Sequence, residues 1–546
     1  MSDSEEEDTR RWSKKHTLNG KQYALTCRMF ECDETGARAS TSISLHLNDG
    51  SITAASVSAY IIHKDKLRGR WFAEMDIHTQ ETVDFAMELF NNRGHLKADF
   101  MNKPVVKGTG VWGEELNDGS LLYITDLNVS QAYRRKGLGS FLVKRLLATE
   151  EVKHCAFAYA WPADTERSFE SLSPDEREAR SATVVELFRK LGFRRVGRTT
   201  FFARALHNSN HPSLKLAIGD DAVAFEDLPE IKGIISKEEK TEASFPIHHA
   251  IANSEASELE RTLRQSHAAN PATLRKTDMR GNTPLHVAAL AMQPSTIRIL
   301  LELGCLPDLQ ARNAKYRTPL EALAASLQST RDFQNSLDLG PFKGHDEKSL
   351  ATWQILAESS PGAAPLQSAD IARIKYGCTC GKCRDGWLSS RAAFHLQATL
   401  GFHYDTSSEP AAGRAWKDFD ILGSDFYPLS LRRTRNAKSL HREIKAMQLK
   451  VLNVFQRGEA PTLIASKIPS SPNDVSPNHV MAAVLEYARA GGLDYQGDGT
   501  FYEDFDEPMA ALPSCENDED WELMRHVIGI TKEQSRGYGD MEDWLH

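Results

Sequence analysis

The stretch Arg134-Arg135-Lys136-Gly137-Leu138-Gly139 decides the fold of the first part of this 546-residue chain. It lies between residues 121–130, an apolar segment that predicts a strand, and residues 140–149, whose apolar side chains recur at helical spacing. Glycine has no Cβ, so the backbone at Gly137 and Gly139 can approach a ligand closely. The loop opens a helix, and the first N–H groups of a helix lack partners and carry the positive end of its dipole. The sequence therefore predicts a pyrophosphate site here.

The segments around this loop predict an α/β domain. Before the loop, two turn signals, Asn48-Asp49-Gly50 and Asn117-Asp118-Gly119, indicate hairpins. A dinucleotide-binding fold fits poorly, because the glycine spacing differs and the strand before the loop comes from a hairpin rather than from a crossover. The expected strands are residues 22–32, 41–46, 52–63, 108–116, 121–130, 155–161 and 195–205, and the expected helices are residues 82–91, 140–149 and 181–191.

The order strand, glycine loop, helix, strand, helix, Gly-Phe, strand resembles the GNAT acetyltransferase superfamily. The coenzyme A loop of that family reads Gln/Arg-x-x-Gly-x-Gly/Ala, and Arg134, Gly137 and Gly139 match it. The preceding family strand commonly ends Leu-x-Val, which is similar to Leu127-Asn128-Val129 here. The matching motifs cover about residues 105–205. The resemblance implies a GNAT-fold N-acetyltransferase domain at residues 20–206.

The resemblance also implies a co-substrate and the residues that bind it. Acetyl-coenzyme A would lie in a split between neighbouring strands, and an amine acceptor would attack its thioester directly. No covalent acyl-enzyme is required, and a backbone N–H near Val129 would stabilise the charge that develops on the thioester oxygen. The residues expected to bind the coenzyme are Leu127, Val129, Arg134, Arg135, Lys136, Gly137, Leu138, Gly139 and Ser140.

Asp126 is the candidate catalytic base. It directly precedes Leu127, where many relatives carry an acidic residue, and strand alternation places it on the face opposite Leu127. The alternative is that Asp126 only forms an ion pair with a nearby Lys or Arg. Glu114 and Glu115, on the strand expected before it, are weaker candidates.

Two positions depart from the family pattern in the helix at residues 181–191. Ser181 stands where the family usually has Asn, and Phe188 stands where it often has the Tyr that protonates the leaving thiolate. Phenylalanine cannot donate a proton, so water or another residue, such as Tyr159, must do so. These departures leave open a second hypothesis, a catalytically weak acyl-coenzyme A-binding adaptor.

A repeat begins at Phe245-Pro246-Ile247-His248 and recurs at Thr283-Pro284-Leu285-His286 and at Thr318-Pro319-Leu320-Glu321. The middle copy continues Val-Ala-Ala and resembles the ankyrin signature Thr-Pro-Leu-His-x-Ala. Residues 244–330 are therefore expected to form all-α ankyrin repeats, which bind a protein partner or dock within the chain. The competing interpretation of these residues is an ordinary helical hairpin domain, and an ankyrin-based scaffold is the third functional hypothesis.

Cys378, Cys380 and Cys383 place three thiols in six residues. Zinc binds thiolates, and a structural zinc site needs four ligands. The fourth ligand could be His395, His403 or Cys515. The alternative is a compact loop of reduced, unliganded thiols, and the run is also loosely similar to short cysteine segments beside ankyrin repeats in some fungal proteins.

The composition is that of a multidomain chain without a predicted membrane segment. Apolar residues make up 40% and charged residues 26%, and no run of eighteen apolar residues occurs. The net charge of −9 gives no reason to expect nucleic acid as a partner. The acidic start and the sparse cysteines predict an intracellular protein, cytoplasmic or nuclear. The remaining segments are predicted as a disordered acidic tail (1–19), a linker (207–243) and a helical C-terminal region (331–546).

Overall fold

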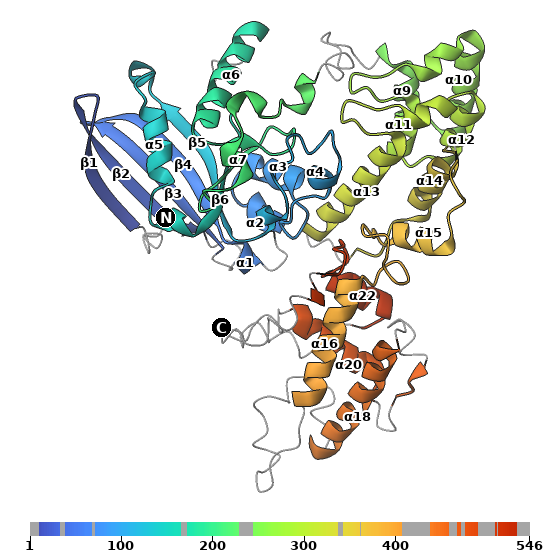
Figure 1. The fold of residues 1–546 in the computed structure, drawn as a ribbon. Coiled ribbons are helices and arrows are strands. Elements are labelled where there is room, and N and C mark those ends of the chain that lie inside the picture. Colours follow the sequence, from blue (N-terminus) through green and yellow to red (C-terminus); the bar gives the residue numbers. More distant parts are fainter. Residues whose placement is uncertain are drawn as a thin grey trace, which may run out of the picture. The chain divides into compact units, whose positions relative to one another are not determined.

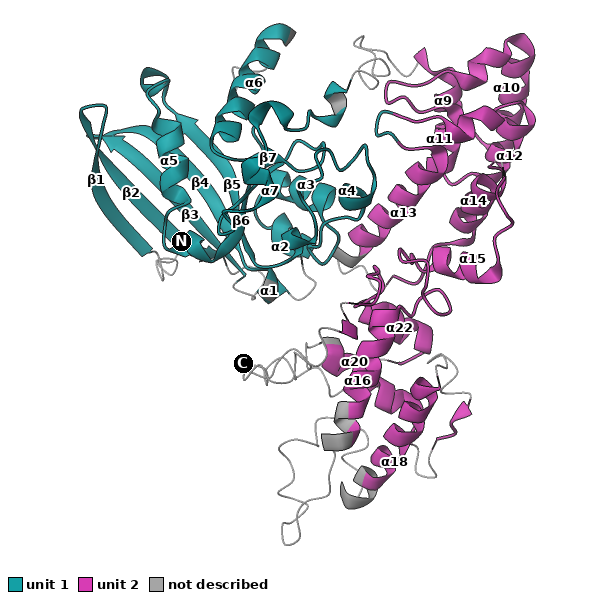
Figure 2. Ribbon diagram, in the orientation of Figure 1, with its two compact units in different colours: residues 1–239, 314–316 teal, residues 240–313, 317–546 magenta. Residues whose placement is uncertain are grey.

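The structure is a computed structural model of the chain, and its compact units are shown in Figure 2. Unit 1 comprises residues 1–239 and 314–316, and unit 2 comprises residues 240–313 and 317–546. None of the helices in the described ranges is both long enough and apolar enough to span a membrane. The described residues are 10–32, 39–67, 71–164, 172–228, 244–336, 342–360, 362–406, 437–457, 467–470, 475–489, 508–509 and 511–531.

Unit 1 is built on an eight-stranded mixed sheet with the order β1-β2-β3-β4-β5-β6-β8-β7. The pairs β1–β2, β2–β3, β3–β4 and β4–β5 are antiparallel, and the pair β5–β6 is parallel. The strands are β1 (Arg10–Leu18), β2 (Lys21–Cys32), β3 (Ser40–Asp49), β4 (Ile52–Ile62), β5 (Ser120–Val129), β6 (Cys155–Ala160), β7 (Arg194–Arg195) and β8 (Phe202–Ala205).

Helices cover both faces of this sheet (Figure 1). One face packs on α5 (Leu138–Leu146) and α6 (Pro174–Lys190) through Leu142, Phe188 and their neighbours. The other face packs on α2 (Trp71–Asp76) and α3 (Gln80–Leu89), where Phe85 contacts an aromatic cluster. Three short helices complete the unit: α1 (Lys64–Leu67), α4 (Asp99–Asn102) and α7 (Pro212–Lys215).

The expectation of a disordered tail over residues 1–19 is wrong for its second half. Residues Arg10–Leu18 form the edge strand β1, which pairs with β2 from Arg10 opposite Met29 to Leu18 opposite Lys21. The turn between them is Asn19-Gly20, with φ of 53° and 78°. An Asn-Gly pair of this kind is a strong hairpin signal. Residues 1–9 lie outside the described residues.

Two expected strands take other forms. Residues 108–116 form no strand; they end in a short 3₁₀ turn, Glu114–Asn117, so no hairpin precedes β5. Residues 195–205 are not one strand but the short antiparallel pair β7 and β8, joined through Gly197 at φ 57°. The other strand predictions of unit 1 are confirmed to within a few residues.

The linker predicted at residues 207–243 starts too early. Asp221 accepts the Arg189 guanidinium at 2.7 Å and the Arg195 backbone N–H at 3.1 Å, and His211 is buried. Residues 207–228 therefore pack on the sheet domain, because their polar side chains satisfy groups of α6 and β7. Residues 229–243 lie outside the described residues.

Unit 2 begins with three helix pairs that share one apolar core. Each first helix starts at the proline of one of the three repeated motifs, and the third pair continues past residue 330, the expected end of the array. The pairs are α9 (Pro246–Asn253) with α10 (Ala256–Ala269), α11 (Pro284–Leu290) with α12 (Pro294–Glu302), and α13 (Pro319–Ser336) with α14 (Glu347–Glu358).

The rest of unit 2 is helical, as expected. A second core joins helices from this region, with Leu396, Val451, Met481 and Leu523 among its fully buried residues. The two helices predicted at 439–456 and 478–490 are present within two residues of those bounds. The helices are α15 (Ser368–Lys375), α16 (Ser390–Thr406), α18 (Ala437–Gln456), α20 (Pro477–Arg489) and α22 (Trp521–Ile528).

Candidate functional site

Strand β5 extends beyond its parallel partner β6 at the end where the glycine loop begins. The last paired position is Ile124 opposite Ala160. Within the described residues, 126–129 of β5 pair with β4 but with no strand on the β6 side. The Ser130 N–H donates to Ala54 of β4 at 3.0 Å, so the alternating N–H and C=O groups of Leu127 and Val129 point to the open side. The Leu127 N–H bonds to the Asp126 carboxylate and the Val129 carbonyl accepts Arg134 Nε, so the Leu127 carbonyl and the Val129 N–H are the strand groups left for a ligand beside the glycine loop.

The glycine loop leads into a helix N-terminus that no side chain caps. Two loop residues have left-handed backbone, Arg135 at φ 58° and Gly137 at φ 79°. Gly137 is the residue before the first turn of α5, and no side chain there bonds a helix N–H. The Phe141 N–H bonds to the Gly137 carbonyl, which leaves the amides of residues 138–140 as the ordinary donors of a first helical turn. This arrangement suits an anion.

The basic side chains of the loop are exposed and are held close to it. Arg134 Nε donates to the Val129 carbonyl at 3.0 Å. Lys136 Nζ donates to the Ala132 carbonyl at 2.8 Å and lies 5.2 Å from the ring centre of Tyr133. The structure therefore brings the positive charge predicted for this loop to the end of β5.

The two glycines of the motif serve different purposes. A Cβ on Gly137 would meet no atom within 4 Å, so a side chain there would project into the open space in front of the helix. Gly139 is buried, and a Cβ there would lie 3.4 Å from Val129 Cγ2. Gly139 thus allows α5 to pack closely on β5, whereas the absence of a side chain at Gly137 leaves open space at the N-terminus of α5.

A β-bulge at Thr125 decides which way Asp126 points. Ser58 of β4 pairs with Asp126, whereas the next residue, Ala59, pairs with Ile124, so Thr125 is the extra residue. The Thr125 hydroxyl donates to the Ser58 carbonyl at 3.2 Å. After the bulge, Leu127 packs with the α5 side of the sheet, and Asp126 lies on the opposite face, as alternation predicts.

Asp126 has the electrostatics of a base rather than of an ion-pair partner. Asp126 is exposed, but partial desolvation by its neighbours raises its pKa, and a hydrogen bond from the Leu127 N–H opposes that shift. No cation among the described residues contributes to the pKa of Asp126, so the ion-pair alternative finds no support. A carboxylate with a raised pKa accepts a proton more readily at neutral pH.

Glu81, which the sequence analysis did not single out, belongs to the same site. It lies in the first turn of α3, and its carboxylate accepts the Tyr123 hydroxyl at 2.6 Å. Burial raises the pKa of Glu81, and the negative charge of Asp126 raises it further. Two carboxylates that interact electrostatically therefore lie on the α3 side of the sheet, and the negative charge of one raises the pKa of the other.

The side chains of Phe188 and Tyr159, considered above for protonation of the leaving thiolate, both lie in the core. Phe188 is buried and packs on Phe193 with ring centres 5.3 Å apart. Tyr159 is fully buried beside Phe85 and Phe90, and burial raises its pKa. Neither side chain can deliver a proton to a ligand at the end of β5.

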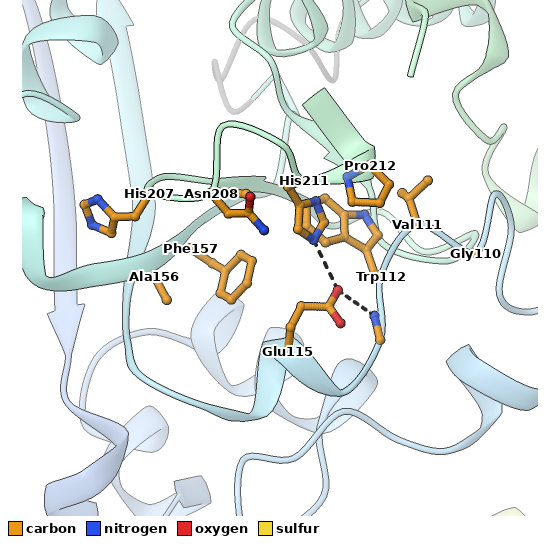
Figure 3. Close-up of a pocket in the computed structure, with 12 residues that line it drawn as sticks. Gly110, Val111, Trp112, Glu115, Ala156, Phe157, His207, Asn208, His211 and Pro212 are labelled. Atoms are coloured by element: carbon orange, nitrogen blue, oxygen red, sulfur yellow. Dashed lines mark hydrogen bonds and ion pairs between the residues drawn. The ribbon is translucent and has the colours of Figure 1, made fainter. Parts of the chain in front are cut away.

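Glu115, the weaker base candidate, lies in a different part of unit 1. It lines a cavity of about 480 Å³ beside Ala156 and Phe157, at the beginning of β6, whereas Asp126 lies near the end of β5 (Figure 3). Its carboxylate accepts the Gly113 N–H at 2.8 Å and lies 3.3 Å from His211 Nε2. Glu114 is its exposed neighbour in the same 3₁₀ turn. The structure does not bring these residues to the glycine loop.

The repeated motifs of unit 2 have buried structural roles. The Thr283 and His286 side chains close a capping box on α11, and His286 Nε2 lies 2.9 Å from the Arg317 carbonyl of the next repeat. His248 Nε2 lies 2.8 Å from the Asn282 carbonyl in the same way. These contacts link successive repeats through buried imidazoles, so the motif residues stabilise the array and are not a binding surface.

The structure places Cys515, one of the three candidate fourth ligands, beside the cysteine loop of unit 2. Cys515 joins Cys378, Cys380 and Cys383, and the four sulfur atoms lie within 4.8 Å of one another. This cluster could bind a metal ion. His395 instead packs on Trp521, with ring centres 5.2 Å apart, and the side chain of His403 lies outside the described residues.

Comparison with known proteins identifies an ankyrin repeat at residues 280–314, which covers α11 and α12. Neither a curated protein nor a solved structure matches the chain. Ankyrin repeats bind other proteins through their surface. The match therefore supports a protein-interaction role for unit 2.

Proposed function

We propose that unit 1 is an N-acyltransferase that transfers an acetyl or related acyl group from acyl-coenzyme A to an amine. The observation that carries the proposal is the open stretch of β5 that runs directly into an uncapped, basic helix N-terminus. The strand can bind an extended, amide-containing chain, and the loop can bind a pyrophosphate. Pantetheine joined to a nucleotide diphosphate has these two parts in this order.

The loop and strand divide the binding of the coenzyme between them. The amides of residues 138–140 and the side chains of Arg134, Arg135 and Lys136 would hold the pyrophosphate. The backbone of Leu127 and Val129 would hold the pantetheine arm, and the coenzyme supplies an acyl group activated as a thioester. The Val129 N–H would stabilise the negative charge that develops on the acyl oxygen.

Asp126 and Glu81 would remove the proton from the attacking ammonium. Desolvation raises the pKa of each carboxyl, at the exposed Asp126 and at the half-buried Glu81, so each is a stronger base than a fully hydrated carboxylate. The neutral amine forms its N–C bond as the C–S bond breaks, and the second proton that the nitrogen then loses passes through water to the leaving thiolate, because Phe188 and Tyr159 lie in the core. All bonds change within one ternary complex, so no nucleophilic side chain is needed.

The ankyrin array would provide the protein-interaction part of this function. Met279, in the turn before α11, is 43% exposed, and apolar groups in such turns are suited to contact another protein. We infer that the array recruits a protein partner, either the amine-bearing acceptor or a protein that positions the enzyme.

A coenzyme-binding adaptor without turnover is the second candidate function. It is favoured by the burial of Phe188 at the position where relatives present a proton-donating Tyr. Such a protein would keep the loop and the open strand but would not need the Asp126 and Glu81 pair.

Calorimetry of the full chain with acetyl-coenzyme A and with coenzyme A tests both candidates. Native mass spectrometry of the purified protein would detect coenzyme that co-purifies. Mass spectrometry of an amine panel containing peptide N-termini, lysine peptides, polyamines and arylamines then measures acyl transfer. Binding with transfer supports the enzyme, and binding without transfer to any acceptor class supports the adaptor. The absence of binding at millimolar coenzyme would reject both.

A further inference from the structure

The four cysteines of unit 2 have the spacing of a tetrahedral thiolate site. The Sγ–Sγ distances are 3.7 Å from Cys378 to Cys380, 3.8 Å from Cys380 to Cys383 and 3.4 Å from Cys383 to Cys515. A tetrahedral zinc ion with Zn–S bonds of about 2.3 Å separates its sulfur ligands by about 3.8 Å. All four cysteines are free, with no disulfide among them. One zinc ion therefore fits between these sulfur atoms with little movement.

Two N–H groups of the chain point to sulfur atoms of the cluster. The Lys382 N–H points to Cys380 Sγ at 3.4 Å, and Asn517 Nδ2 points to Cys383 Sγ at 3.7 Å. Gly381, between these ligands, has φ 68°, which permits the tight turn. N–H donors to coordinating sulfur are the usual supporting contacts of a metal site.

The cluster also lies where separate parts of unit 2 meet. Arg331 of α13 is 1% exposed, and its guanidinium donates to Asn517 Oδ1 at 2.8 Å and to the Asp520 carboxylate. The same guanidinium contacts the carbonyls of Tyr376 and Gly377 at 3.4 and 3.3 Å. The last helix of the array, the cysteine loop and the segment before α22 thus meet around one buried cation.

We propose that Cys378, Cys380, Cys383 and Cys515 bind one structural zinc ion, which fixes the segment before α22 to the cysteine loop and so to the ankyrin array. Four protein sulfur atoms complete the tetrahedral coordination of a zinc ion, which leaves no position for water or substrate. The ion therefore has a structural rather than a catalytic role. Cys515 lies 132 residues beyond Cys383, so the ion closes a long loop of the chain.

Elemental analysis of the full chain tests the metal site. The protein would be expressed with zinc in the medium and purified without chelator, and about one zinc per chain is expected. Cys515→Ser is expected to lower the zinc content at least tenfold, and Cys32→Ser, at a half-buried cysteine of β2, is expected to leave it unchanged. Because Cys515→Ser could unfold the region, Cys515→His provides a second variant that keeps a zinc ligand and should keep the zinc.

Hydrogen exchange with and without chelator tests the structural role. Removal of zinc is expected to raise exchange in residues 378–388 and 511–521 together, while the sheet of unit 1 keeps its protection. Wild-type protein without stoichiometric zinc, or with disulfides among these cysteines, would overturn the proposal. Full zinc in Cys515→Ser would also overturn it, as would a change in exchange confined to residues 378–388.

Discussion

Two helices of this chain begin in opposite ways. Helix α11 begins at Thr283, whose side chain, with that of His286, closes a capping box, and a proline follows in its first turn. Helix α5 begins at Gly137, and no side chain bonds its first N–H groups. The capping residues of α11 are buried, whereas Gly137 is exposed. The first N–H groups of α11 find hydrogen-bond partners within the protein, whereas those of α5 remain as donors that a ligand can use.

This contrast separates residues that maintain a fold from residues that are available for chemistry. The ankyrin motif is recognised because the same local contacts recur in each repeat, for example from His248 to Asn282 and from His286 to Arg317. The glycine loop occurs once, and its Gly137 provides no side-chain cap to the helix that follows. Changes at α5 should therefore affect ligand binding, and changes at α11 should affect stability.

The largest expected effect is on coenzyme binding by Gly137→Glu. The carboxylate would project into open space at the start of α5 and repel a pyrophosphate, and binding should be abolished, an affinity loss of roughly 10⁴-fold or more, about 5.6 kcal/mol. Calorimetry with acetyl-coenzyme A measures this loss. The control is Gly304→Glu, because Gly304 also has positive φ and open space around its Cβ position but lies in unit 2. Unchanged affinity in folded Gly137→Glu protein would remove the coenzyme site from this loop.

The next effect is on turnover by Asp126→Asn. Coenzyme affinity should be kept, because backbone rather than this side chain would hold the pantetheine, and turnover should fall by roughly 10²–10⁴. Because the pKa of Asp126 is raised, the acid limb of the wild-type rate should lie above the ordinary value of 3.8 and be lost in the variant. Asp220→Asn, at an exposed position of unit 1 away from β5, is the matched control. Near wild-type turnover across pH would reassign the base to Glu81 or to water.

A smaller effect, on stability alone, is expected from Thr283→Ala. Removing this buried cap should cost about 1 kcal/mol in the free energy of unfolding of the array, measured by urea denaturation. Thr330→Ala, at an exposed position within α13, should cost much less. Acetyl-coenzyme A binding should be unchanged in both. Equal losses in the two variants would mean that the cap contributes nothing particular to the array.

The smallest expected effect is the pH dependence of stability contributed by Asp126. A raised pKa means that the folded chain binds this proton more tightly than the unfolded chain, so the contribution of Asp126 to stability falls as pH rises from 3.8 through the raised value. Asp126→Asn should therefore gain in melting temperature relative to wild type between pH 3 and pH 7. Glu178→Gln, at an exposed position of α6, should show no such trend. A trend of the opposite sign would mean that the folded state favours the charged carboxylate.

The sequence predicted the local structure on which both helix starts depend. Strand and helix periodicity located β2 to β6, α3 and α5 to within a few residues, and the repeated motifs located the starts of α9, α11 and α13. The main errors lie where a non-local contact decides the outcome. The polar sequence of residues 10–18 predicts a disordered tail, but pairing with β2 makes these residues a strand. The sequence also predicts a linker from residue 207, but the ion pair of Asp221 with Arg189 holds residues 207–228 against α6.

The sequence by itself determined that Gly137 and Gly139 stand at the start of a helix and that Thr-Pro-Leu-His begins another, because capping and glycine geometry act over a few residues. Only the tertiary structure brought Glu81 to Asp126 and Cys515 to Cys383, which are 45 and 132 residues apart. Only it placed Phe188 in the core and Glu115 at the far end of the sheet. The cysteine contact depends on how distant segments of unit 2 pack together, and the side of the sheet that Asp126 occupies depends on strand register and on the bulge at Thr125, where one extra residue determines which face a side chain takes.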